Sequence, residues 1–95
     1  MDLHFDGEIF YWRGPAPFHF VAVPDGESAL IHAARSELTY GWGVIPVEAE
    51  IGETEWTTSL FPKGGRYLVP VKSAVRKAEG VELGDLVNLR LGLDM

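Results

Sequence analysis

Hydrophobic and polar residues alternate along much of the chain, and this period of two predicts β-strands. In the first such segment Leu3, Phe5 and Ile9 fall on one face, and the other face is polar. Alternation, or a short apolar run bounded by glycine or proline, predicts strands over residues 3–13, 18–23, 44–51, 54–61, 66–71 and 85–91. Pro46 lies inside one of these segments, which favours an edge or bulged position there.

Two segments break the alternation and predict helices. The first begins at Asp25 as its N-cap and ends before Gly41-Trp42-Gly43. Its apolar stripe consists of Leu30, Ile31, Ala34 and Leu38. The second follows Pro70 and ends at Gly80, with Val81 making the hydrophobic contact after it. Its inner face consists of Ala74, Val75 and Ala78.

The predicted elements repeat one order, β-β-α-β, in halves that span approximately residues 1–52 and 53–95. Turns are expected at residues 14–17, 52–53 and 62–65, which are rich in glycine and proline. Neither half can bury its apolar face alone, so the two should close over a common core. We therefore expect one domain over residues 1–95, mainly β with two short helices, folded as a small closed β-barrel.

Aromatic residues are numerous for 95 residues, with three Trp, three Tyr and five Phe. We expect most of them to fill the barrel interior, where each buries a large area. Trp42 lies between two glycines and is the aromatic residue that we do not assign to the barrel interior. It is either an exposed interaction anchor or a lid on the barrel end.

Composition narrows the class of protein. With no cysteine, the chain has neither a disulfide frame nor a thiolate nucleophile, and no segment resembles a membrane span or a signal peptide. We expect a cytoplasmic location. The net charge of −6 argues against nucleic acid or an anionic membrane as a partner of the whole surface. Five of the six cations after residue 55 fall between Lys63 and Lys77, which marks either an interaction face or an ordinary solvated one.

Candidate catalytic and metal-binding groups are sparse. His4, Asp6 and Glu8 share one strand face and could ligate a divalent metal, but a solvated strand face is the expected interpretation. His19 and His32 are expected to be surface histidines. The hydroxyls at residues 57–59 have no general base in a recognisable motif, and no phosphate-binding or dinucleotide-binding loop is present. We expect no enzyme activity, no cofactor and no metal.

The best anion site in the sequence is Lys63-Gly64-Gly65-Arg66. Glycines free backbone N–H groups to point at a phosphate or carboxylate, and the two cations add charge. The same residues also suit an ordinary turn between strands. Arg76 and Lys77 add two further cations on the second helix.

Several stretches resemble known families. Gly65-Arg66-Tyr67-Leu68-Val69-Pro70, Val75-Arg76, Gly80 and Gly84-Asp85 resemble the swapped-hairpin element of AbrB-, MazE- and MraZ-type proteins. Phe5-Asp6-Gly7-Glu8-Ile9, Thr58-Ser59-Leu60-Phe61-Pro62-Lys63-Gly64-Gly65 and Leu68-Val69-Pro70-Val71-Lys72 with Val75-Arg76-Lys77 resemble the domain-of-unknown-function family 1905 of bacteria and archaea. That resemblance runs nearly end to end. It implies a double-split β-barrel related to AbrB-type DNA binders, without an established activity. It also implies a protein partner of the bacteriocin-protection (YdeI/OmpD-associated) type.

The sequence thus predicts a non-enzymatic binding module that engages a protein partner or a small anionic ligand. The expected contact residues are Lys63, Gly64, Gly65, Arg66, Arg76 and Lys77, with Trp42 as an apolar anchor. The alternative is a divergent AbrB-like DNA-binding regulator that uses the same cations. A shared fold does not by itself imply DNA binding. The first half of the chain is also acidic, which disfavours binding to phosphates. A monomer and a homodimer both remain open.

Overall fold

The computed structural model describes residues 1–13, 18–38 and 45–93. Within them, six strands and two helices follow one another in the predicted order, β-β-α-β twice. The elements are β1 (Asp2–Trp12), β2 (Phe18–Ala22), α1 (Asp25–Leu38), β3 (Ile45–Ile51), β4 (Thr54–Lys63), β5 (Arg66–Pro70), α2 (Ser73–Glu79) and β6 (Leu86–Leu93).

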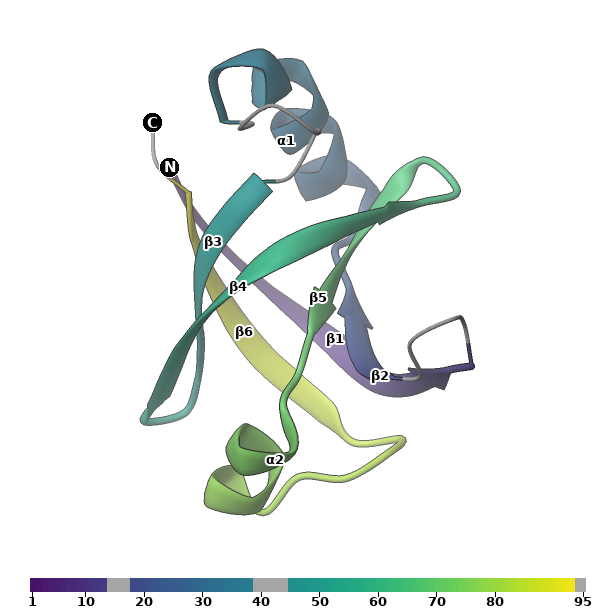
Figure 1. Cartoon of the computed structure of the whole chain (residues 1–95), viewed down its shortest axis with the longest axis vertical. Helices are drawn as coiled ribbons and strands as arrows, with labels where there is room; N and C mark the ends of the chain where they lie inside the picture. The colour runs from purple at the N-terminus through teal and green to yellow at the C-terminus, as the bar shows by residue number, and fades with distance from the viewer. Residues whose placement is uncertain (14–17, 39–44, 94–95) are drawn as a thin grey trace.

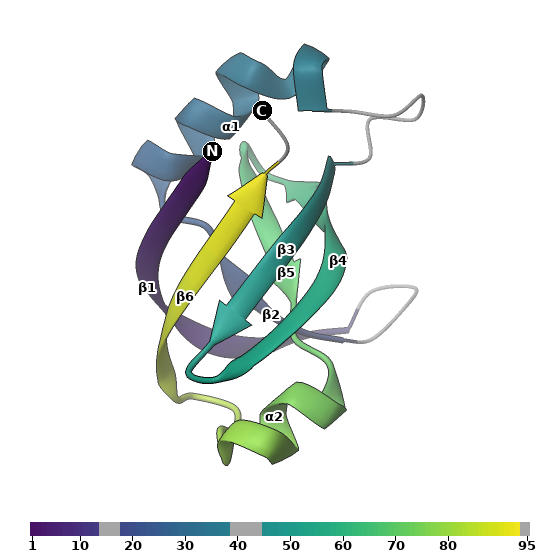
Figure 2. The same cartoon turned by 90° about the vertical axis from the view of Figure 1, so that its left-hand side faces the viewer.

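The strands close into the barrel that the pattern predicted, in the order β1-β2-β5-β4-β3-β6, and every neighbouring pair is antiparallel. The two helices lie at opposite ends of the barrel (Figures 1 and 2). The fold class is therefore confirmed: mainly β, with two helices and a closed barrel. Kinship with the AbrB-type swapped hairpin stays a prediction.

Strand β1 pairs with two different strands along its length. Residues 2–8 pair with β6, and residues 9–12 pair with β2. Gly7 lies just before the change of partner, and a Cβ built on it would stand 2.4 Å from Cγ1 of Val21. Because Val21 is fully buried, it has no room to move away. The strand can cross over this side chain only with a glycine at position 7.

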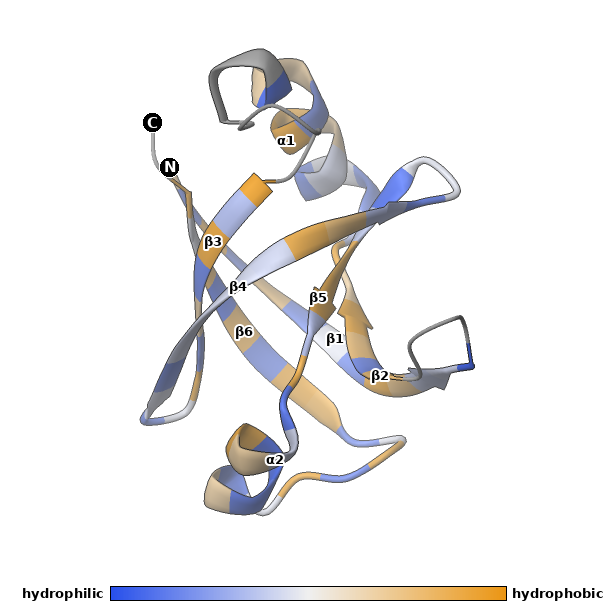
Figure 3. Ribbon diagram, in the orientation of Figure 1, coloured by the Kyte–Doolittle hydropathy of each residue, from blue (hydrophilic) through white to orange (hydrophobic). Residues whose placement is uncertain are grey.

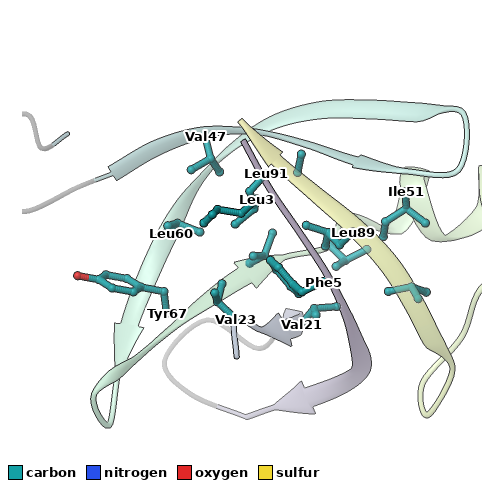
Figure 4. Close-up of a cluster of buried hydrophobic side chains, with 14 of the residues drawn as sticks. Leu3, Phe5, Val21, Val23, Val47, Ile51, Leu60, Tyr67, Leu89 and Leu91 are labelled. Atoms are coloured by element: carbon teal, nitrogen blue, oxygen red, sulfur yellow. The ribbon is translucent and has the colours of Figure 1, made fainter. Parts of the chain in front are cut away.

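The core is formed by the inward side chains of all six strands (Figure 4). Hydropathy alternates along β3 and β6, as Figure 3 shows, because successive side chains point to opposite faces of a strand. Val87, Leu89 and Leu91 are buried, as predicted. Met1 and Leu93 meet at one end of the barrel: the amino group of Met1 donates to the carbonyl of Leu93 at 2.9 Å, and the N–H of Leu93 donates to the carbonyl of Met1 at 2.8 Å.

Helix α1 packs through a narrower stripe than predicted. Ile31 is buried and Ala34 is half-buried, but Leu30 is 54% exposed. Leu30 was assigned to the core wrongly, because one helical step of 100° turns it away from the barrel end that Ile31 contacts. Ser28 supports the contact: its Oγ donates to the carbonyl of Val23 at 3.0 Å and accepts from the N–H of Tyr67 at 3.4 Å.

Helix α2 is attached to the barrel by one buried side chain, Val75. Ala74 and Ala78 are exposed, so their prediction as inner-face residues was wrong. A helix of seven residues touches the barrel along a single line and leaves its neighbouring positions in solvent. Gly80 ends the helix with φ of +63°, and Val81 packs against the core, both as predicted.

Three details of the strands refine the prediction. The Gly52-Glu53 hairpin is confirmed, since Ile51 and Thr54 are paired on either side of it. Strand β4 continues through Pro62 and Lys63, so the next turn is shorter than predicted. Pro46 lies in a strand with two neighbours rather than at an edge, one residue before the pairing with β6 begins. Neither described helix has the length and apolarity needed to cross a bilayer.

Candidate functional site

The aromatic side chains divide between the inside and the outside of the barrel. Phe5, Trp56 and Tyr67 belong to the core. A second group packs on the outer surface of β1, β2 and β4 and is called here the outer aromatic cluster: Phe10, Trp12, Phe18, Phe20 and Phe61. The prediction that most aromatics fill the interior was therefore wrong. Strand alternation places Phe10 and Trp12 on the face opposite Ile9, which points inward.

Phe20 is the centre of the outer aromatic cluster. Its ring centroid lies 6.1 Å from that of Phe10, 6.0 Å from Trp12, 6.2 Å from Phe18 and 6.2 Å from Phe61. The rings meet at tilted or edge-to-face angles, the arrangement that aromatic quadrupoles favour. Phe20 is only 2% exposed, whereas Phe18 is 54% and Phe61 is 45% exposed. The cluster therefore has a fixed base and an open apolar surface.

This surface borders a groove of about 820 Å³. Its walls come from the end of β1, from β2, from β4, and from the segment that leads from β5 into α2. The lining residues are Trp12, Phe18, His19, Phe20, Thr58, Phe61, Pro70, Val71, Lys72, Ser73 and Arg76. Most of them are apolar or aromatic. A groove of this size and composition falls within the usual range of small-molecule sites, roughly 300–1,000 Å³.

Arg76 supplies a positive charge to the groove. It lies on α2 and is half-buried, and its Nε donates to the carbonyl of Val71 at 3.4 Å. Among the described residues, no hydrogen bond or ion pair engages its two Nη groups. Lys72, exposed, lines the same groove. Among the described residues, no carboxylate forms an ion pair with either of them.

His19 also lines the groove, and its imidazole is close enough to Arg76 to feel its charge. Its ring packs edge-on against Tyr11, with 5.2 Å between centroids. Partial burial lowers the pKa of His19 below its ordinary value of 6.5, and the positive charge of Arg76 lowers it further. The imidazole is therefore neutral near neutral pH. In this state His19 contributes a polar edge to the groove without a second charge.

Both cations of the predicted anion site at the β4–β5 turn make contacts within the chain. Nζ of Lys63 lies 4.3 Å from the ring centroid of Trp12. Nε of Arg66 donates to Oδ1 of Asp25 at 2.7 Å, and this bond and the accompanying charge lower the pKa of Asp25. Gly64 and Gly65 both have positive φ, as a tight turn requires. The charge of Arg66 is thus already balanced.

The predicted contact residues do not form one patch. The β4–β5 turn and α2 lie at opposite ends of β5 (Figure 1). Of the predicted residues that the structure describes, Arg76 alone lines the aromatic groove, while Lys77 is exposed elsewhere on α2. Trp42 lies outside the described residues.

The polar face of β1 pairs with cations and amides across the strands. Asp6 accepts a hydrogen bond from Nδ2 of Asn88 at 2.9 Å. Arg90 contacts Asp2 at 3.1 Å and Glu50 at 3.2 Å. Within the described ranges, no three His, Asp or Glu side chains come close enough together to hold a metal ion.

Sequence reasoning missed the main lining residues of the groove: Phe18, His19, Phe20 and Phe61. A signal was present, because residues 10–12 and 18–23 are apolar on both faces of their strands. One apolar face beyond what the core needs indicates a second buried or binding surface. The contribution of Val71 had no such signal, since it depends on where α2 begins.

Comparison with known proteins gives a family and no activity. No curated protein matches the chain. The family model described as "Domain of unknown function (DUF1905)" matches residues 5–91, which include all six strands in whole or in part and every described residue of the groove. The chain therefore belongs to this family of unknown function.

Proposed function

We propose that the chain is a non-enzymatic binding module that holds, in the groove beside the outer aromatic cluster, a ligand with an apolar body and a negative charge. One observation carries this proposal: Phe18 and Phe61 are exposed together over the buried Phe20, and Arg76 lines the same groove. Contiguous exposed apolar side chains with a polar rim are typical of binding sites.

The polar groups of the groove support binding rather than catalysis. Thr58 and Ser73 bring hydroxyls and His19 brings an imidazole. Among the hydrogen bonds of the described residues, none joins His19 to either hydroxyl. A hydroxyl becomes a nucleophile only when a base takes its proton. These groups instead suit orientation of a bound ligand.

Charge distribution gives less support to the DNA-binding alternative. Arg66 is paired with Asp25, and Arg90 is surrounded by Asp2, Glu50 and Glu55. Affinity for nucleic acid rests on cations that replace the counterions of several phosphates. Paired arginines contribute little to such an exchange.

A fluorescence titration with anilinonaphthalene sulfonate, an aromatic anion, tests the proposal. We expect saturable binding at one site per chain. Phe61→Ser should weaken it about tenfold, because the exposed ring contributes apolar contact to the probe. Leu83→Ser is the matched control, since Leu83 is 60% exposed and does not line the groove. It should bind like the wild type.

Equal binding by the wild type and Phe61→Ser would contradict the groove as the site. Absence of any saturable binding would contradict the ligand-binding function. A labelled DNA duplex titrated in parallel separates the alternative. Tight binding of the duplex that is lost in moderate salt would favour the nucleic-acid function instead.

A further inference from the structure

We propose that the ligand of this groove is a small aromatic monocarboxylate, whose ring packs against Phe20 and Phe61 and whose carboxylate pairs with the Nη groups of Arg76. This inference rests on the proposed function and names the chemical class of its ligand. It follows from the shape of the apolar walls, from the orientation of one guanidinium, and from the hydrogen bonds that the surrounding backbone already makes.

The walls favour a flat aromatic body over a flexible chain. Phe18 and Phe20 stand at 87° to each other, and Phe20 and Phe61 at 47°. A planar guest that lies on the exposed surface of Phe18 and Phe61 meets differently oriented rings, and it can contact them edge-on or face-on, which are the arrangements that aromatic pairs prefer. An alkyl chain gains only the apolar contact. It also loses more rotational freedom on binding than a rigid ring does.

Arg76 is prepared to receive a planar group with two oxygens. The Nε–H donates to the carbonyl of Val71 at 3.4 Å, and this long hydrogen bond favours one orientation of the guanidinium. Its two Nη groups remain side by side for a pair of parallel hydrogen bonds. A carboxylate presents two oxygens at the matching separation, and arginine binds it in this two-bond mode.

The charge of the walls matches a single anion. Among the described lining residues, Arg76 is the cation that the surrounding structure holds in place, and Lys72 is exposed and screened by solvent. His19 stays neutral near pH 7, because burial and Arg76 lower its pKa. The single negative charge of a carboxylate is therefore balanced by Arg76, whereas a phosphate monoester brings a second negative charge.

The backbone around the groove disfavours an extended peptide. Peptides that bind along a sheet need unpaired N–H and C=O groups on an edge strand. Here β2 pairs with both β1 and β5, so the wall that β2 forms has neighbours on both sides, whereas β4 pairs with β5 only over residues 61–63. Past the end of β5, Val71 still donates its N–H to the carbonyl of His19. This wall therefore contacts a ligand through its side chains.

Calorimetric titration of the full chain with four probes tests the inference. The probes are naphthoate, the neutral naphthamide of the same shape, octanoate, and naphthyl phosphate. We expect the wild type to bind naphthoate at least about tenfold more tightly than naphthamide, since a paired charged hydrogen bond is lost in the amide. Octanoate and naphthyl phosphate should both bind more weakly than naphthoate.

Variants of α2 assign the anion site. Arg76→Gln should abolish the preference for naphthoate over naphthamide, and Arg76→Lys should retain only part of it, because lysine keeps the charge without the paired donors. Lys77→Gln is the matched control and should retain the full preference. The Arg76→Lys result keeps the inference testable if Arg76→Gln fails to fold.

The outcomes separate the two proposals. If naphthoate and naphthamide bind the wild type equally well, the groove binds ligands but the carboxylate class is wrong. Tighter binding of octanoate would contradict the aromatic class, and tighter binding of naphthyl phosphate would contradict the single carboxylate. If none of the four probes binds, the proposed function itself fails.

Discussion

The indole Nε1 of Trp56 donates a hydrogen bond to the carbonyl oxygen of Pro70 at 3.1 Å. Strands β4 and β5 pair through their backbones only over residues 61–63 and 66–68, so this bond joins them where the backbone ladder has already stopped. Pro70 and the two residues after it form one wall of the groove. A buried core side chain thus holds the position of a groove wall.

Removing the indole N–H should destabilise the protein. We expect Trp56→Phe to lower the free energy of unfolding by about 1–2 kcal/mol, because a buried hydrogen bond is lost and a small void remains. Urea denaturation followed by circular dichroism measures the change. Trp12→Phe, on the outer surface, is the comparison and should cost less than about 1 kcal/mol. An equal cost for both variants would contradict a specific contribution from the bond to Pro70.

A second prediction concerns the crossing of β1 over Val21. Gly7→Ala places a methyl group 2.4 Å from Cγ1 of Val21, which is fully buried. Overpacking of this kind typically costs about 1–3 kcal/mol of stability, and thermal or urea denaturation would measure it.

The matched control for Gly7 is Gly26→Ala in α1, where a Cβ has nothing within 4 Å. Alanine favours helix over glycine, so this variant should be unchanged or more stable by up to about 1 kcal/mol. Stability of Gly7→Ala equal to that of the wild type would show that β1 can shift away from Val21.

Stability should also depend on pH through His19. The pKa of His19 in the folded chain lies below its ordinary value of 6.5, so protonation favours the unfolded chain. The contribution of neutral His19 is therefore complete above about pH 6.5 and is lost as the pH falls through the folded-state pKa. Between pH values of about 7.5 and 5, His19→Gln should lose less stability than the wild type. An equal change of the free energy of unfolding with pH in the wild type and in His19→Gln would contradict the prediction.

The ion pair between Arg66 and Asp25 should contribute little. Both side chains are largely exposed, so solvent screens their attraction. We expect the urea midpoint of Arg66→Gln to lie close to that of the wild type, with any difference vanishing at high salt. A large loss that persists in salt would show that this pair fixes the β4–β5 turn against α1.

Alternation of apolar residues was sufficient to predict the elements of the fold. Leu3, Phe5 and Ile9 recur every second residue or at even spacing, and all three lie in the core. Element order and the absence of a self-sufficient half then favoured a closed barrel. What alternation does not determine is the use of the second face. It gave no reason to keep Phe18 and Phe61 out of the interior.

The predicted contact residues that the structure describes lie apart for a related reason. Sequence proximity grouped Lys63 with Arg66 and Arg76, but Asp25, far away in the sequence, neutralises Arg66. The partner of a charged side chain is set by the packing of α1 against β5, which no local motif records. The sequence named Arg76 as one of several cations and gave no sign that it lines an aromatic groove.

The pairing of β1 with β6 also sets the order in which the molecule can form. Residue 2 pairs with residue 92, and the backbone groups of Met1 bond those of Leu93. Contacts between such distant parts of a chain are slow to form, because a large loop must close before they contribute any stability. During synthesis β1 therefore emerges first and acquires one of its two neighbours only when β6 has been made. Until then the inward apolar side chains of β1 lack their contacts with β6, and exposed apolar side chains of this kind favour association with other chains.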